Sequence, residues 1–92
     1  MKLIVWNYEK NEWLKVWRGV SFEQVLLLIE DGKILDIIEH KNKKKYPNQR
    51  VIVVEIANYV YSVPFVETKK EIFLKTIFPD RKLTKNYLKR GE

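Results

Sequence analysis

The sequence predicts a single α+β domain spanning residues 1–92, with a twisted, mostly antiparallel sheet packed by helices. Between residues 8 and 30, apolar side chains recur at helical spacing. Between residues 51 and 78, apolar runs alternate with short turns, as in neighbouring antiparallel strands. The 92 residues, 46% of them hydrophobic, suffice for one compact core and leave no room for a second. The expected element order is β-α-α-β-β-β-β-α.

The first strand and helix are predicted in the N-terminal segment. The apolar run LIVW at residues 3–6 indicates a strand. Asn7 is suited to be the N-cap of a helix over residues 8–18, because its side-chain oxygen can accept a backbone N–H. Gly19 can end this helix, since glycine readily adopts the left-handed conformation found there. The apolar residues at helical spacing are Trp13, Leu14 and Trp17.

A second helix is expected from Ser21 to the pair Asp31-Gly32. Ser21 and Gln24 predict a capping box, in which each side chain bonds the backbone N–H of the other residue. Apolar residues then recur at i, i+3, i+4 and i+7, which gives the helix one face for burial. The two helices should form a hairpin. The apolar residues of the second helix are Phe22, Val25, Leu26 and Ile29.

After residue 33 the apolar residues no longer recur at helical spacing, and three further strands are indicated. Residues 34–38 (ILDII) are the first candidate, and residues 51–57 (VIVVEIA) are apolar on both faces, as expected of a central strand. Asn58 marks a tight turn into a strand at residues 59–66. Pro64 predicts an edge or a bulge in the later half of that strand, because proline has no N–H to donate.

The last strand is expected at residues 71–78, after a turn at residues 67–70. A terminal helix then starts at Pro79-Asp80, with Asp80 as its N-cap. This helix is rich in basic side chains, a composition that suits either a polyanionic partner or a solvated face. Its basic residues are Arg81, Lys82, Lys85, Lys89 and Arg90.

Charge is distributed unevenly along the chain, whose formal net charge is +6. Residues 1–39 hold five Lys or Arg against seven Asp or Glu, a net of −2. Residues 40–92 hold thirteen against five, a net of +8. The stretch HKNKKKYPNQR at residues 40–50 has five basic residues and no acidic one. Such asymmetry favours a polyanionic partner, nucleic acid first, and solubility alone is the other interpretation.

Composition argues against several classes of function. The chain has no cysteine, so it offers neither a disulfide nor a thiolate for a metal, and its single histidine disfavours a zinc site. We expect no cofactor and no metal. The opening apolar run is too short for a signal peptide, and no stretch is long enough to span a bilayer. A soluble cytoplasmic protein with no membrane partner is expected.

Three segments carry a family resemblance. Residues 5–22 end in GVSF, followed by Glu23. His40 lies in the loop after the second predicted strand, and Arg50 lies at the entry of the next. The chain closes with the basic motif RKLT at residues 81–84, which is similar to a motif RRAT. Together these segments resemble the BrnT-type toxins of type II toxin–antitoxin systems, within the RelE/ParE-like superfamily, over nearly the whole chain.

The resemblance implies a RelE-like fold and an endoribonuclease that inhibits translation. It also implies a cognate antitoxin, typically of ribbon-helix-helix type, which covers the toxin and binds operator DNA, so that the toxin meets DNA only through its antitoxin. RNA cleavage without metal proceeds by attack of a 2′-OH on the adjacent phosphate. That reaction needs a base, an acid and positive charge beside the phosphorane.

Departures from the family pattern keep two other hypotheses open. Family members usually have His where this chain has Arg18, often have Glu where it has Tyr87, and have Arg where it has Lys82. The second hypothesis is therefore a non-catalytic module of the same fold, which binds nucleic acid or a protein partner through its basic half. The third is a housekeeping RNA-binding protein unrelated to toxins.

Three residues are candidates for the chemistry. His40 is the first candidate for acid or base, because histidine titrates near neutrality. Its alternative role is a solvated residue at the end of a strand. Arg50 and Arg81 are candidates for phosphate binding, since the guanidinium group offers paired planar donors. Arg81 follows a helix cap, where free N–H groups also favour an anion, whereas Arg50 has the alternative of pairing with Glu55 or another strand neighbour.

The lysines are expected to hold RNA rather than to cleave it. Three of them form the run in the basic loop, and their alternative role is only to keep the loop solvated. Lys75 interrupts the strand at residues 71–78 and is expected on the open face of the sheet, where its alternative role is a solvated side chain. Two lysines of the terminal helix share one stripe with Lys89, which can follow an RNA backbone, receive acidic residues of the antitoxin or form a solvated face. The lysines assigned to RNA are Lys43, Lys44, Lys45, Lys75, Lys82 and Lys85.

The three tryptophans allow two interpretations. Trp6, Trp13 and Trp17 can stack on nucleotide bases. Their placement on the first strand and at helical spacing favours the core or the antitoxin interface instead. A toxin that keeps a surface for its partner can leave one of them exposed.

Overall fold

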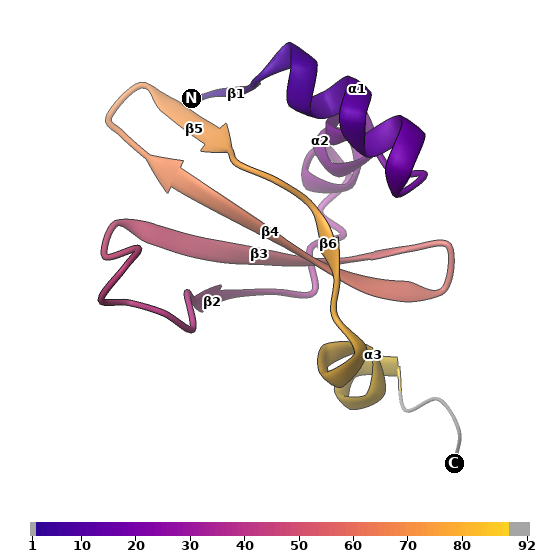
Figure 1. Cartoon of the computed structure of the whole chain (residues 1–92). Coiled ribbons are helices and arrows are strands. Elements are labelled where there is room, and N and C mark those ends of the chain that lie inside the picture. The colour runs from indigo at the N-terminus through magenta and orange to yellow at the C-terminus, as the bar shows by residue number, and fades with distance from the viewer. Residues whose placement is uncertain (1, 89–92) are drawn as a thin grey trace.

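The computed structural model describes residues 2–88, in which six strands form one mixed sheet and three helices pack against it (Figure 1). The strand order is β1-β5-β4-β3-β2, and β6 pairs with β4 beside β5. Only β1 (Leu3–Trp6) and β5 (Glu71–Leu74) run parallel, while the other pairs are antiparallel. The α+β class and the mostly antiparallel sheet are confirmed.

The first two helices begin at the predicted caps. Asn7 accepts the Lys10 N–H at 2.8 Å and starts α1 (Tyr8–Trp17), which ends one residue earlier than predicted. Ser21 and Gln24 form the expected capping box at the start of α2 (Phe22–Glu30). These contacts lie within three residues of each other in the sequence, so local side-chain chemistry was enough to predict them.

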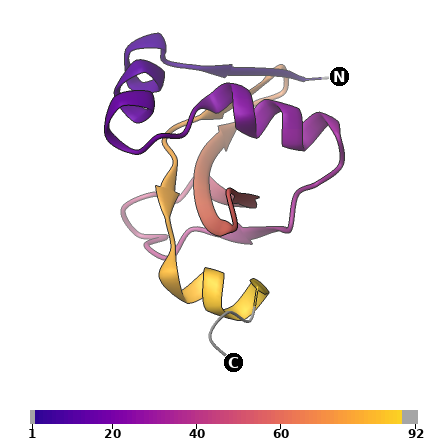
Figure 2. The same cartoon turned by 90° about the vertical axis from the view of Figure 1, so that its right-hand side faces the viewer.

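The buried side chain of Asn11 joins the two helices. Its Oδ1 accepts the Phe22 N–H at 2.8 Å, and its Nδ2 donates to Glu23 at 2.8 Å. The helices lie on one side of the sheet (Figure 2). There they bury the larger core, whose fully buried helical members are Leu14, Phe22 and Val25.

A long hairpin of β3 (Gln49–Ile56) and β4 (Tyr59–Glu67) forms the middle of the sheet. Its turn places Ala57 and Asn58 at φ values of 52° and 64°, so the turn predicted at Asn58 is confirmed. β2 covers Asp36–Glu39 and is displaced from the predicted 34–38 toward the C-terminus.

The prediction that Pro64 marks an edge is wrong, because β4 is an interior strand. The alternative of a bulge is supported, because the pairing shifts by one residue beside Pro64, between Phe65↔Leu74 and Ser62↔Phe78. Pro64 is buried where the neighbour of β4 changes from β5 to β6 (Phe78–Pro79). Its carbonyl accepts the Lys75 N–H at 2.8 Å. The missing N–H faces the same side of β4, toward the segment between β5 and β6, so proline costs the β3–β4 ladder no bond.

A single strand over residues 71–78 is also wrong. The chain leaves the sheet after Leu74 and returns as β6, so Lys75 lies in a linker rather than on a strand. The predicted order therefore holds for every element except this last strand, which is divided in two.

The third helix, α3 (Arg81–Leu88), packs on the sheet face opposite α1 and α2 (Figure 2). Asp80 accepts the Leu83 N–H at 2.9 Å, which confirms the predicted cap. Thr84 is buried, and its hydroxyl accepts the Val60 N–H at 2.9 Å. Lys89 and Arg90 lie outside the described residues. No helix within residues 2–88 combines the length and hydrophobicity needed to cross a membrane.

Candidate functional site

The basic loop between β2 and β3 folds back on itself around Asn42. The Asn42 carbonyl accepts the Tyr46 N–H at 2.9 Å, and its side-chain oxygen accepts the Lys45 N–H at 3.2 Å. This turn brings the Tyr46 ring to 4.6 Å from the His40 ring, centroid to centroid. The loop is therefore an ordered turn with an aromatic pair at its base.

His40 is half-buried, and its Nδ1 accepts the Asn42 N–H at 3.1 Å. In the neutral ring the hydrogen then lies on Nε2, because one nitrogen accepts and the other donates. His40 is thus arranged to donate a hydrogen bond to a phosphate oxygen. Taking a proton through Nε2 would require the contact between Nδ1 and Asn42 to break.

His40 lines a small cavity of about 70 Å³ between β2 and α3. Most of the lining is apolar. An engineered cavity of about 150 Å³ binds benzene, so a cavity of about 70 Å³ is too small to enclose a nucleobase. The other lining residues are Ile38, Glu39, Lys41, Val51, Ser62, Phe78, Asp80 and Leu83.

The N-terminus of α3 lies beside this cavity and already holds a carboxylate. Asp80 is 9% exposed, and its Oδ2 lies 3.7 Å from Lys41 Nζ. Its other oxygen caps the helix, so the cap position that was expected to favour a phosphate is occupied. Arg81 is exposed and, with Tyr59, Thr84 and Lys85, lines a separate shallow depression.

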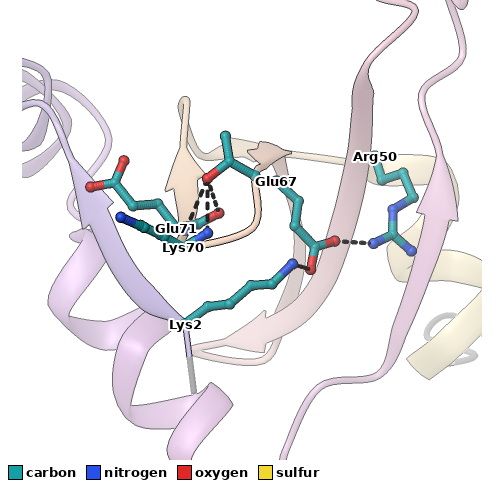
Figure 3. Close-up of polar contacts among 6 residues, drawn as sticks. Lys2, Arg50, Glu67, Lys70 and Glu71 are labelled. Carbon is teal, nitrogen blue, oxygen red and sulfur yellow. Dashed lines mark hydrogen bonds and ion pairs between the residues drawn. The ribbon is translucent and has the colours of Figure 1, made fainter.

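Arg50 belongs to a different cluster (Figure 3). Its Nη2 lies 2.6 Å from Glu67 Oε1, and its Cζ lies 5.2 Å from the centroid of the Phe65 ring. Lys2 binds the second oxygen of Glu67. The hydrogen bonds from Lys2 and Arg50 lower the pKa of the Glu67 carboxyl below its usual value. Arg50 thus pairs with a strand neighbour, though with Glu67 rather than Glu55.

The sheet separates Arg50 from His40. Arg50 is opposite Glu39 in the β2–β3 ladder, and Ile38 is opposite Val51 on the α3 face. Side chains alternate between faces along a strand, so His40 follows Ile38 toward the α3 face and Arg50 points to the other. The structure therefore brings His40 near Asp80 at the start of α3, whereas Arg81 lines a separate depression and Arg50 lies on the other face of the sheet.

Three of the six candidate lysines make an ion pair or a contact with an aromatic ring. Lys43 Nζ lies 3.4 Å from Glu39, and Lys45 Nζ lies 5.4 Å from the Tyr46 ring. Lys75, in the linker after β5, lies 5.1 Å from the Phe73 ring. The remaining candidates are exposed and make no ion pair within residues 2–88. They are Lys44, Lys82 and Lys85.

The tryptophans divide between core and surface. Trp6 stacks on Phe22 with ring centroids 5.6 Å apart. Trp13 and Trp17 are 41% and 70% exposed on α1, on the sheet face opposite the basic loop's His40. They form no platform beside the loop, which makes them a surface separate from the candidate site.

Sequence reasoning missed two residues beside His40, which are Lys41 and Tyr46. An available signal was Asn42, whose side chain favours a turn that reverses the chain. An aromatic residue within a basic run was another, since such a pairing is typical of nucleic-acid interfaces.

Fold and site together define an α+β protein with a mixed sheet and a basic, histidine-bearing loop beside its last helix. No protein-family model, curated protein or solved structure matches this chain.

Proposed function

We propose that the protein is a BrnT-type toxin with a RelE-like fold: a metal-independent endoribonuclease that inhibits translation and is neutralised by a ribbon-helix-helix antitoxin. The GVSF segment, the position of His40 and the closing motif at residues 81–84 support the proposal. The order of elements supports it as well, since only the last strand differs from the expected order.

The observation that carries the proposal is the position of His40 within the basic loop. Its ring packs on Tyr46, and the exposed loop lysines follow immediately. RNA phosphates held by Lys44 and its neighbours would lie beside Nε2 of His40. In this scheme His40 exchanges a proton with the 2′-OH or the leaving 5′-oxygen, and Arg81 stabilises the phosphorane. Arg50 supports the fold through Glu67.

The second candidate is a non-catalytic module that binds nucleic acid. A specific observation favours it: Nδ1 of His40 is occupied by the Asn42 N–H, and Arg50 lies across the sheet in an ion pair. The three residues proposed for catalysis do not converge on one phosphate. Binding needs only the exposed lysines and a donor at Nε2, and these are present without rearrangement.

A cleavage assay distinguishes the two. The purified chain is incubated with end-labelled RNA in EDTA, alongside His40→Ala, Arg81→Ala and the control Arg50→Ala, with binding followed in parallel. The ribonuclease proposal predicts cleavage that resists EDTA, persists in the control and is lost in the other two variants while binding remains. Binding without cleavage, on free RNA and on RNA in translating ribosomes, would favour the non-catalytic module.

The antitoxin is tested through the gene neighbourhood. A short adjacent reading frame with a ribbon-helix-helix pattern is expected. Co-expression of that product should yield a complex that no longer binds RNA but does bind operator DNA. An RNA-cleaving chain with no such neighbour would keep the enzymatic proposal and remove the toxin–antitoxin context.

A further inference from the structure

The outer edge of β1 carries unpaired backbone groups. β1 is an outer strand of the sheet, and none of residues 2–88 pairs with it on the side away from β5 (Figures 1 and 2). The Leu3 N–H donates to the Lys70 carbonyl of the β5 side at 2.9 Å. Backbone directions alternate along a strand, so the N–H and C=O groups of Ile4 and Trp6 point outward. These groups can accept another strand.

An apolar groove of about 610 Å³ lies between the first residues of β1 and α2. Leu3 is 67% exposed at its mouth. A strand added to β1 would place every second side chain toward this groove, because side chains alternate between the faces of a sheet. The groove is lined by Lys2, Leu3, Ile4, Leu26, Ile29, Glu30 and Ile72.

The two outer strands of the sheet differ in how they discourage pairing. β2 begins with Asp36 and ends with Glu39, and charges of this kind protect an exposed edge. β1 reads LIVW, with no charge and no proline. Its short length is the only such protection within the strand. β1 is therefore the edge at which strand addition is least opposed.

We propose that the outer edge of β1 binds an extended segment of a different protein, which adds as a strand, inserts alternate apolar side chains into the groove and ends in acidic residues. The unpaired N–H and C=O groups of β1 can bind an extended strand, and the groove can bind its apolar side chains. Lys69 and Lys70 border Leu3, are exposed and make no ion pair within residues 2–88, so they can bind the acidic end.

A second copy of the chain is a poorer occupant than an acidic partner. Each copy carries a formal net charge of +6, and edge-to-edge pairing would bring two such charges together. The proposal rests on the edge, the groove and the neighbouring lysines. It does not depend on the ribonuclease function, and either can fail without the other.

The test uses a synthetic octapeptide with two acidic residues followed by valine and threonine in alternation. Binding is followed by amide chemical shifts, and amide hydrogen exchange is measured with and without saturating peptide. In the free protein the Ile4 and Trp6 amides should exchange rapidly and the Val5 amide slowly. Peptide should protect Ile4 and Trp6. A peptide N-methylated at every second residue should not bind, since it lacks the donors that face β1.

A variant on β1 and a matched control on β2 show whether the peptide binds at the β1 edge. Leu3→Glu places a negative charge beside Lys69 and Lys70, where the acidic end is proposed to bind, and should weaken or abolish peptide binding. Ile37→Glu, at a 46% exposed position on β2, should leave binding unchanged. Replacing both Lys69 and Lys70 with Gln should weaken binding roughly two- to fivefold for each ion pair removed, the range of exposed pairs.

Three outcomes would overturn the proposal. The first is peptide binding without protection of Ile4 and Trp6. The second is equal loss of binding in Leu3→Glu and Ile37→Glu. The third is a dimer in analytical ultracentrifugation that Leu3→Glu dissociates, because a second copy would then occupy the edge.

Discussion

The phenolic oxygen of Tyr87 donates a hydrogen bond to Oδ2 of Asp36 at 2.6 Å, which joins α3 to the first residue of β2. The bond lowers the pKa of the Asp36 carboxyl and, through the same contact, raises the pKa of the Tyr87 hydroxyl. It connects the most basic helix to the strand that leads into the His40 loop. The pH dependence of the free energy of unfolding can show whether this hydrogen bond is present.

Replacing Tyr87 with Phe should lower stability slightly near neutrality, because both partners are exposed. The carboxylate contribution is complete above the ordinary Asp36 value of 3.8 and is lost as pH falls through the lowered pKa. The hydroxyl contribution is complete below 10.0 and is lost as pH rises through the raised pKa. The difference in urea midpoint between the two proteins should therefore shrink at both extremes. A difference that is constant with pH would contradict the assignment.

Thr84→Val should reduce the free energy of unfolding by about 1–3 kcal/mol, because the buried Val60 N–H would lose its acceptor. Urea denaturation measures the change.

Thr76→Val is the matched control. The Thr76 hydroxyl is buried with no hydrogen-bond partner among the described residues, so a methyl group in its place should be neutral or stabilising. Equal losses in the two variants would mean that side-chain shape, rather than the hydrogen bond, determines the cost at Thr84.

Glu67→Gln should remove part of the acid sensitivity of the fold. Lys2 and Arg50 lower the pKa of the Glu67 carboxyl, so its contribution is complete above 4.5 and is lost as pH falls through the lowered value. The wild-type protein should therefore exceed the variant in stability near neutrality and approach it on acidification. Glu55→Gln, on β3 and outside any ion pair in residues 2–88, should show no such convergence.

Replacing Lys43, Lys44 and Lys45 with Gln should weaken RNA binding and flatten its salt dependence. For single-stranded RNA the slope of log K against log salt should fall by up to roughly 2, at about 0.7 for each phosphate that is no longer neutralised. Filter binding over a salt series measures it. Gln at Lys33, Lys69 and Lys70 removes the same charge elsewhere and should leave the slope unchanged. Equal effects would show that binding follows net charge alone.

Predictions that rest on neighbouring residues were confirmed. Asn7, the Ser21–Gln24 box, the turn at Asn58 and the cap at Asp80 each involve contacts within a few positions of the chain. Such contacts form wherever the local sequence allows, so propensity and spacing are sufficient to find them.

Predictions that depend on pairing between strands far apart in the sequence were partly wrong. Pro64 is disfavoured inside a sheet, yet it lies in an interior strand because β5 ends and β6 begins beside it. The division of the last strand follows from which part of β4 each piece pairs with. No local pattern in residues 71–78 shows that choice, because pairing across the sheet decides it.

The candidate site shows the same division. The basic loop, its histidine and the basic last helix are visible in the sequence as composition and charge. Only the tertiary structure decided that Arg50 and His40 face opposite sides of the sheet, that Asp80 already occupies the start of α3, and that the β1 edge stays open. Helix caps and tight turns are set by atoms a few bonds apart along the chain. Strand register and the packing of faces are set by side chains that meet only after the whole chain has folded.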